Sequence, residues 1–291
     1  MTERVDVRKT YKLYIGGAFP RSESGRSYPV VDAQGRFWAH AALASRKDGR
    51  DAVLAARKAQ PGWAARSAYN RGQVLYRVAE VLEGRRIQFA DEISRAEGVS
   101  PEQAETLVDA AVDRWVWYAG WTDKVGQVLG SANPVAGPFF NLSTPEPTGV
   151  VVAVAPPDSS LLGLVSVLAP IVATGSAAVV LASEHAPLPA ITLAEVLATS
   201  DVPSGVVNLL TGRMAEIAPW LASHRDVDAL DLTGVPLTDG GELATSLEAA
   251  AADTLTRVRR PEPDADWRAT PGLDRLSWLV ETKTVWHPIG T

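Results

Sequence analysis

Cysteine is absent from the 291 residues of this chain. Without a thiol the protein can form no disulfide, no thiolate-ligated metal site, no iron–sulfur cluster and no cysteine nucleophile. The histidines also lack metal-ligand spacing, and neither a His-Glu-x-x-His motif nor a Gly-x-Ser-x-Gly segment is present. The four histidines are His40, His185, His224 and His287. The sequence therefore predicts no metal site and no substitute serine nucleophile.

Positive charge is in the minority, with 28 Lys and Arg against 34 Asp and Glu and a net charge of -6. An acidic surface repels a phosphate backbone, so we expect no nucleic-acid partner. Residues 1–14 are charged and contain no apolar stretch of the kind found in secretory signals, which favours the cytoplasm. With 46% hydrophobic and 21% charged residues, the chain has the composition of a globular protein with a large core.

One long uncharged run, Leu161 to Ala182, is long enough to span a bilayer if it forms a single helix. Pro170 and Gly175 interrupt it, and no Lys or Arg borders it to fix an orientation. We therefore predict an apolar helix, a turn and a buried strand rather than a membrane span.

Residues 1–126 are predicted to form a peripheral hairpin followed by helices. The hairpin is expected within residues 11–29, which alternate apolar with polar residues and are rich in turn residues. Asp48 is expected to cap the first helix, and Pro61-Gly62 to end it. Apolar stripes at helical spacing then mark core faces. These stripes are Val74, Leu75, Val78 and Leu82, followed by Leu107, Ala111, Val112, Trp115 and Ala119.

Residues 149–258 alternate short β-branched runs with helical segments. Continuous apolar runs are typical of parallel strands buried on both faces. The predicted strands are Val150–Val154, Ala177–Leu181, Val206–Leu210 and Val227–Leu232, with helices at Pro187–Ala198, up to Leu221 and from Gly241. The fold class is therefore α/β, with a Rossmann-like parallel sheet.

Residues 259–291 are predicted to be a linker and a detached terminal strand. Arg259–Asp264 is rich in proline and mixed in charge, a short helix is expected around Leu273, and Glu281–Trp286 is strand-like. A lone strand needs an edge to pair with, and another subunit could supply it. Trp286 and the cluster of Trp115, Trp117 and Trp121 would suit such an interface.

A series of short motifs follows in order along the chain: Tyr118–Lys124, Gly137–Phe139, Glu146–Val151, Ser183-Glu184, Pro203–Asn208, His224–Asp228, Thr233-Gly234 and Thr282–Trp286. In content and spacing they resemble the NAD(P)-dependent aldehyde dehydrogenase family. The resemblance implies that residues 127–148 form the hairpin, and residues 282–286 the terminal strand, that join subunits in that family.

The catalytic part of that family has no counterpart here. In the family a large domain with the nucleophilic cysteine and a Glu-Leu-Gly-Gly segment lies between the Thr-Gly-Ser strand and the terminal strand, whereas this chain has only Pro236–Val280 there. Asp158 stands at the position of the family's oxyanion-binding Asn, and a carboxylate offers only acceptors. Asp158 can equally be a loop or N-cap residue beside Ser159 and Ser160.

The resemblance also implies that the nucleotide site is vestigial. Ser183, Glu184, Gly212 and Gly234 remain from it, and Glu184 could accept from ribose hydroxyls or be a solvated charge beside His185. Five residues of the family's nucleotide site are replaced in this chain. Leu181 and Ala182 stand for the family's Lys-Pro, Met214 and Ala218 for two glycines, and Val235 for a serine. We therefore expect no cofactor, or only weak NAD(P) binding.

The sequence as a whole predicts a catalytically inactive homologue with a structural or regulatory role. Its expected partner is a full-length aldehyde dehydrogenase, or a second copy of itself. Two alternatives remain. One is a sensor that binds NAD(P) without reaction, and the other is an oxidoreductase subunit that uses the cysteine of a partner.

Overall fold

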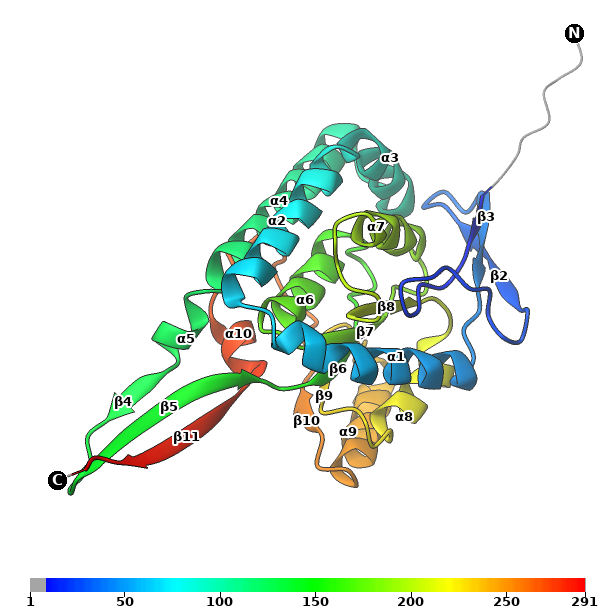
Figure 1. The fold of residues 1–291 in the computed structure, drawn as a ribbon. Helices are drawn as coiled ribbons and strands as arrows, with labels where there is room; N and C mark the ends of the chain where they lie inside the picture. The colour runs from blue at the N-terminus through cyan, green and yellow to red at the C-terminus, as the bar shows by residue number, and fades with distance from the viewer. Residues whose placement is uncertain (1–8, 291) are drawn as a thin grey trace, which may run out of the picture.

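A five-stranded parallel sheet lies at the centre of the computed structural model, which describes residues 9–290 (Figure 1). Its strands, in spatial order, are β10 (Arg257–Arg259), β9 (Ala229–Asp231), β6 (Val150–Val154), β7 (Ala177–Leu181) and β8 (Val207–Leu210). The chain runs outward from β6 through β7 to β8, then returns to place β9 on the other side of β6. The order of the strands therefore reverses between β6 and β9, and such a switch point is where parallel sheets bind ligands.

The α/β class and the Rossmann-like winding are confirmed, and the sheet has one strand more than predicted. Arg259, assigned to the linker from sequence, belongs to β10, where it pairs with Asp231 of β9. With three residues and an arginine at each end, β10 carries no apolar run that would mark it as a strand.

Successive residues of the central strands face two separate hydrophobic cores. In β6, Val151 and Ala153 pack with α6 (Leu162–Ala173) and α7 (Leu188–Ala198). Val150 and Val152 pack on the opposite face, which three other helices cover. Those helices are α1 (Arg46–Ala64), α8 (Met214–Ala222) and α9 (Glu242–Ala252). Burial of both faces explains why these strands are apolar throughout.

An outer layer of helices covers α6 and α7 (Figure 1). It consists of α2 (Ala68–Glu83), α3 (Arg86–Glu97) and α4 (Pro101–Trp121). The apolar stripes predicted for this part lie in α2 and α4, and most of their residues are buried. Trp115 is fully buried, while Trp117 and Trp121 pack against the same core. The tryptophans before the hairpin therefore contribute to the core, Trp117 and Trp121 only in part, and their role in an interface stays a prediction.

The N-cap of α1 lies three residues before the predicted cap, Asp48. Ser45 is the N-cap, and its side chain accepts a hydrogen bond from the Asp48 backbone N–H, while the Asp48 carboxylate accepts from Ser45 N–H at 2.8 Å. Asp48 thus completes a capping box from inside the helix. Pro61 lies within the last turn and does not end the helix, because its carbonyl still accepts from Ala65 N–H.

The uncharged run from Leu161 to Ala182 forms α6, a turn through Gly175 and β7, as predicted. Gly175 takes a positive φ of 94°, which a residue with a side chain rarely adopts. None of the helices within residues 9–290 is long and apolar enough to cross a membrane. The first eight residues of the charged N-terminal stretch lie outside the described part.

A tight hairpin forms around Gly16-Gly17 within residues 11–29, as predicted, since Ile15 and Ala18 exchange backbone hydrogen bonds at 3.0 Å, and a second hairpin follows it. β2 (Ser27–Val31) pairs antiparallel with β3 (Phe37–Ala42), and β1 (Thr10–Tyr11) lies parallel to β3. The turn between β2 and β3 is fixed by Asp32, whose carboxylate accepts from the backbone N–H groups of Gln34 and Arg36.

A separate three-stranded sheet projects from the body (Figure 1). Its order is β11 (Val280–Pro288), β5 (Phe139–Pro147) and β4 (Ser131–Asn133), all antiparallel, and the short α5 (Val125–Val128) precedes it. The C-terminal strand is detached from the central sheet, as predicted, but it has a partner in its own chain. β11 pairs with β5 along its whole length, so another subunit is not needed to supply its first neighbour.

Candidate functional site

The loops that follow β6 and β9 meet at the switch point of the central sheet. They enclose a cavity of about 350 Å³. Its walls are Pro156–Ser159 from the loop after β6, Thr233–Leu237 from the loop after β9, and Glu262, Pro263, Ala265 and Trp267 from the segment beyond β10. We call this the switch-point cavity. Two of the predicted site residues, Asp158 and Gly234, lie in the wall of this cavity.

Gly234 allows the two loops to touch. A Cβ atom at this position would lie 2.2 Å from the carbonyl oxygen of Ala155, which no side chain can tolerate. The backbone N–H of Gly234 donates to the Val154 carbonyl at 3.1 Å, so the contact is also a hydrogen bond. Val235 follows with its side chain buried in the core, where it presents no donor to the cavity.

Asp158 lies on the rim of the switch-point cavity with an exposed side chain. It does not cap the helix that follows. The N-cap of α6 is Leu161, and the Ser159 hydroxyl accepts from the N–H of Gly163 in its first turn at 2.9 Å. Of the two readings of Asp158, the structure favours a loop residue whose carboxylate faces the cavity and solvent.

Glu97, at the end of α3, holds the loop that carries Asp158. Its carboxylate accepts from both the backbone N–H and the hydroxyl of Ser160, at 2.7 and 2.6 Å. Burial raises the pKa of Glu97, the two hydrogen bonds from Ser160 lower it, and the nearby charge of Asp158 raises it further. The cavity itself is lined by the carboxyl groups of Asp158 and Glu262 and by no lysine, and Glu97 lies behind its wall.

Ser183 and Glu184 follow β7 at the same edge of the sheet. The Ser183 hydroxyl is structural, since it donates to the Pro157 carbonyl at 2.8 Å and accepts from Ala186 N–H at 3.1 Å. The Glu184 carboxylate accepts from Arg213 at 2.8 Å, and the Glu184 backbone carbonyl accepts from Tyr28. Burial raises the pKa of the Tyr28 phenol, which therefore stays a donor. Glu184 is thus paired with a guanidinium rather than simply solvated, and its contact with a ribose stays a prediction.

Gly212 follows β8 and precedes the first turn of α8. It takes a φ of 144°, and a Cβ there would lie 3.1 Å from the backbone nitrogen of Ala44. Met214 is half-buried against the core beneath α8, and Ala218 is fully buried. The two positions predicted to have lost glycine therefore carry side chains that pack into the helix layer.

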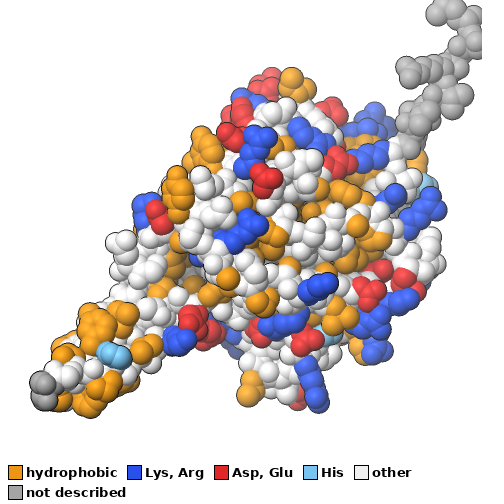
Figure 2. Space-filling model, in the orientation of Figure 1, with side chains coloured by type: hydrophobic (Ala, Val, Ile, Leu, Met, Phe, Trp, Pro, Cys, Tyr) orange, Lys and Arg blue, Asp and Glu red, His pale blue; other side chains and the backbone are white. Residues whose placement is uncertain are grey.

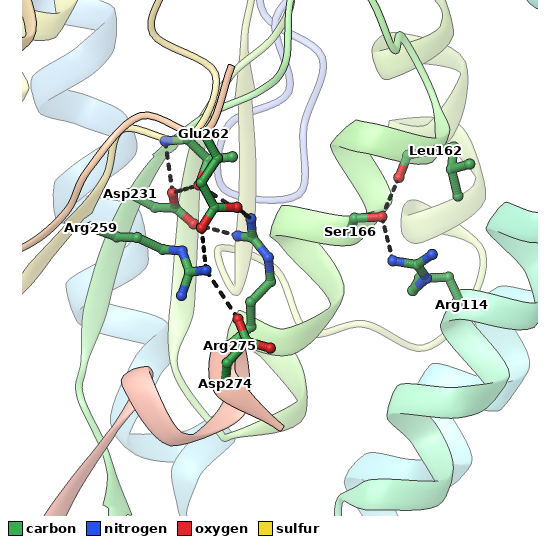
Figure 3. Close-up of polar contacts among 9 residues, drawn as sticks. Arg114, Leu162, Ser166, Asp231, Arg259, Glu262, Asp274 and Arg275 are labelled. Atoms are coloured by element: carbon green, nitrogen blue, oxygen red, sulfur yellow. Dashed lines mark hydrogen bonds and ion pairs between the residues drawn. The ribbon is translucent and has the colours of Figure 1, made fainter. Parts of the chain in front are cut away.

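A buried ionic network meets the switch-point cavity at Glu262, and no motif in the sequence predicts it (Figure 3). Arg275, in the short α10 (Asp274–Trp278), donates to Asp231 at 3.1 Å and to Glu262 at 2.8 Å. Asp231 ends β9 and also accepts from the backbone N–H of Thr233. Only 3% of the Asp231 side chain and 10% of the Arg275 side chain is exposed.

Further bonds tie the segment 260–279, which we call the closing segment, to the rest of the chain. Arg259 of β10 donates to Asp274 at 3.0 Å and also bonds Glu262. Arg114 of α4 donates to the carbonyls of Trp267 and Ala269, at 2.7 and 3.0 Å, and to the hydroxyl of Ser166 in α6 (Figure 3). The closing segment is therefore anchored to the sheet near both of its ends and to the helix layer near its middle.

Ser183, Glu184 and Gly212 lie along the same edge as the switch-point cavity, but they do not line it. Each follows the carboxyl end of a strand, as sequence reasoning predicted, and Ser183 contacts the cavity loop through Pro157. Within residues 9–290, no three His, Asp or Glu side chains gather as metal ligands.

Comparison with known proteins places these features in context. The model of the Aldehyde dehydrogenase family matches residues 19–258. The cytosolic aldehyde dehydrogenase 1 of Elephantulus edwardii is 32% identical over 252 residues, and the match covers 85% of this chain and 49% of that protein. The mitochondrial benzaldehyde dehydrogenase of Antirrhinum majus is 31% identical, with 82% and 44% covered.

Among solved structures, an NAD+ complex of an aldehyde dehydrogenase from Bacillus cereus superposes with a TM-score of 0.79 at 25% identity, and the match covers 86% of this chain and 50% of that one. The chain thus spans about half the length of the relatives it matches. The closing segment and β11 lie beyond the matched residues, so the resemblance of residues 282–286 to the family's terminal strand stays a prediction.

Proposed function

The chain belongs to the aldehyde dehydrogenase family, and we propose that it is a catalytically inactive member with a structural or regulatory role. One observation carries the proposal. From Gly234 to β11 the chain contains only α9, β10, α10 and the connections between them, including the closing segment and the short 3-10 helix Thr238–Gly241. The strands on both sides of this stretch, β9 and β11, pair with other strands of the same chain. The small number of residues between them is therefore a feature of the fold itself.

The chemistry of the switch-point cavity supports the same proposal. The chain has no cysteine to attack an aldehyde carbonyl. Asp158 would place a negative charge where an oxyanion needs a hydrogen-bond donor, and Val235 offers no hydroxyl. Glu97 and Glu262 are engaged by Ser160 and by arginines, respectively, so neither is free to act as a general base.

The closing segment bears on the alternative in which a partner supplies the cysteine. To reach the switch-point cavity, a partner's catalytic loop would have to pass the wall formed by Glu262, Pro263, Ala265 and Trp267. That wall is held by Arg275 and Arg114 through buried bonds. We therefore rank this alternative below the inactive homologue.

We predict that the purified chain forms no NAD(P)H from aldehydes and hydrolyses no ester substrate. The measurement is absorbance at the nicotinamide band and release of a chromogenic phenol, each before and after treatment with a thiol-alkylating agent. Because the chain has no cysteine, turnover that disappears on alkylation comes from a contaminating enzyme. Turnover that resists alkylation and follows this chain through purification would contradict the proposal.

NAD(P) is expected to bind weakly or not at all. The chain lacks the family's lysine, two glycines and serine at this edge, contacts typically worth about 1 kcal/mol each. The retained Glu184 is paired with Arg213, so a ribose must compete with a guanidinium. Titration calorimetry with NAD+ and NADP+ measures this directly. Micromolar binding that weakens in Glu184→Ala would instead support the alternative of a sensor that binds NAD(P) without reaction. The structure of the Bacillus cereus relative in complex with NAD+ is the reason to test this alternative.

The proposed partner is a full-length aldehyde dehydrogenase, and a second copy of this chain is the alternative. The three-stranded sheet is the surface we assign to either partner, because β11 is its edge strand and all of β11 beyond Val280 is exposed. The cytoplasmic location stays a prediction. The assembly is tested with sheet variants, as argued in the Discussion.

A further inference from the structure

A second cleft lies far from the switch-point cavity, between the start of α1 and the end of α8. Its volume is about 390 Å³. It is lined by Arg46, Gly49, Arg50, Ile217, Trp220, Leu221, Ser223, His224 and Arg225. Since α8 begins at the carboxyl end of β8, the end of α8 lies toward the opposite edge of the sheet. We call this the α1–α8 cleft.

Positive charge gathers in the α1–α8 cleft although the chain as a whole is acidic. Arg46 and Arg225 have no acidic partner within residues 9–290, and Arg50 is paired with Asp51 at 2.8 Å. His224 accepts the backbone N–H of Asp226 through Nδ1, which leaves Nε2 for a ligand. Three arginines around one cleft repel one another unless an anion lies between them.

Asp48 and Glu216, the acidic residues in the first turns of α1 and α8, are engaged away from the cleft. Asp48 of α1 accepts from Ser45 N–H and from the Ser22 hydroxyl, and it is buried. Glu216 of α8 lies 3.9 Å from Arg213 at the other end of its helix. Neither carboxylate is among the residues that line the cleft, so Arg46 and Arg225 meet no acidic group in its lining.

The cleft also has an aromatic wall and an apolar floor. Trp220 is 47% exposed, and the Arg46 guanidinium lies 3.7 Å from the centre of its ring, a cation–π contact that holds Arg46 at the cleft. Ile217 and Leu221 are buried beneath it. Gly49 of α1 lies directly against this floor, since a Cβ there would lie 3.4 Å from Leu221 and 3.6 Å from Ile217.

We propose that the α1–α8 cleft binds a small organic phosphate. Guanidinium groups match the oxygens of a phosphate in a two-pronged geometry, which favours arginine over lysine at such sites. The unpaired Arg46 and Arg225 supply this recognition. The apolar body of the ligand packs on Trp220 and on the floor, which distinguishes the site from one for inorganic phosphate alone.

The test is titration calorimetry with phenyl phosphate, inorganic phosphate, benzoate and benzyl alcohol at low ionic strength. Phenyl phosphate is expected to bind most tightly and benzyl alcohol not at all. Arg46→Gln and Arg225→Gln are each expected to weaken phenyl phosphate binding about tenfold. Trp220→Ala is expected to reduce the affinity for phenyl phosphate to that for inorganic phosphate.

Lys58→Gln is the matched control, because it removes one positive charge from an exposed position farther along α1. It is expected to change binding less than twofold, a difference well under 1 kcal/mol. Unfolding curves of each variant show whether the fold is kept. The proposal is overturned if phenyl phosphate does not bind, if its affinity is the same in both arginine variants as in the original chain, or if benzoate binds as tightly.

Discussion

Replacing Arg275 by methionine is expected to lower the free energy of unfolding by about 3 to 5 kcal/mol. The substitution keeps most of the side-chain volume but leaves the Asp231 carboxylate buried without its cation. It also removes one of the two arginines that bond Glu262. A buried charge that loses its only ionic partner bears the full cost of desolvation, which is why a change in one residue has so large an effect.

Urea unfolding measures the loss, and Arg260→Met is the control. Arg260 lies in the same segment and pairs with Glu248, but its side chain is 81% exposed, so its removal should cost about 0.5 kcal/mol or less. The double variant Asp231→Asn with Arg275→Met should lose less than the two single variants together, because no unpaired charge remains. Equal losses for Arg275→Met and Arg260→Met would mean that the buried pair does not anchor the closing segment.

The central sheet could be predicted because a strand that is buried on both faces needs an apolar side chain at every position. Val150–Val154 and Ala177–Leu181 are apolar throughout, and both lie where the sequence places them. β10 could not be found in this way, because it is a short edge strand whose two arginines reach out to other segments. The N-cap was misplaced because Ser45 and Asp48 satisfy each other, and either one alone would be a good cap.

At the candidate site, the sequence located positions but not partners. Gly234 could be identified from the short motif Thr233-Gly234. Its role needs no second residue far along the chain, since it only requires that no side chain be present where the backbone meets Ala155. The pair of Glu184 with Arg213 and the pair of Asp231 with Arg275 each join residues far apart in the chain. An isolated arginine in a sequence has no periodicity or motif, so only the fold shows which carboxylate it meets.

The three-stranded sheet carries an apolar surface that the chain itself does not cover. Figure 2 shows hydrophobic side chains gathered at its tip. Val285 and Trp286 of β11 are 44% and 58% exposed, and Trp286 makes an edge contact with Phe139. Pairing with β5 satisfies one edge of β11, and its other edge is open in the described chain. An exposed strand edge beside exposed aromatic groups is a typical association surface.

Substituting Val285 and Trp286 together by lysine is therefore expected to convert the assembled protein to monomer. Central apolar and aromatic contacts often contribute 2 kcal/mol or more to an interface, so the association constant should fall about 100-fold or more. Sedimentation velocity measures the change, with the chain alone and with a full-length aldehyde dehydrogenase. Deletion of residues 281–291 should have the same effect and leave the central sheet folded, as circular dichroism would show.

The matched control is Ile87→Lys with Leu255→Lys, which adds the same charge at two exposed apolar positions away from the three-stranded sheet. This variant should sediment like the original chain, because isolated apolar residues on a surface do not form an interface. A complex formed only with the full-length enzyme supports the proposed partner, and a complex formed by the chain alone supports the homo-oligomer. If the intact chain sediments as a monomer in both experiments, β11 is no association surface and the proposed assembly is wrong.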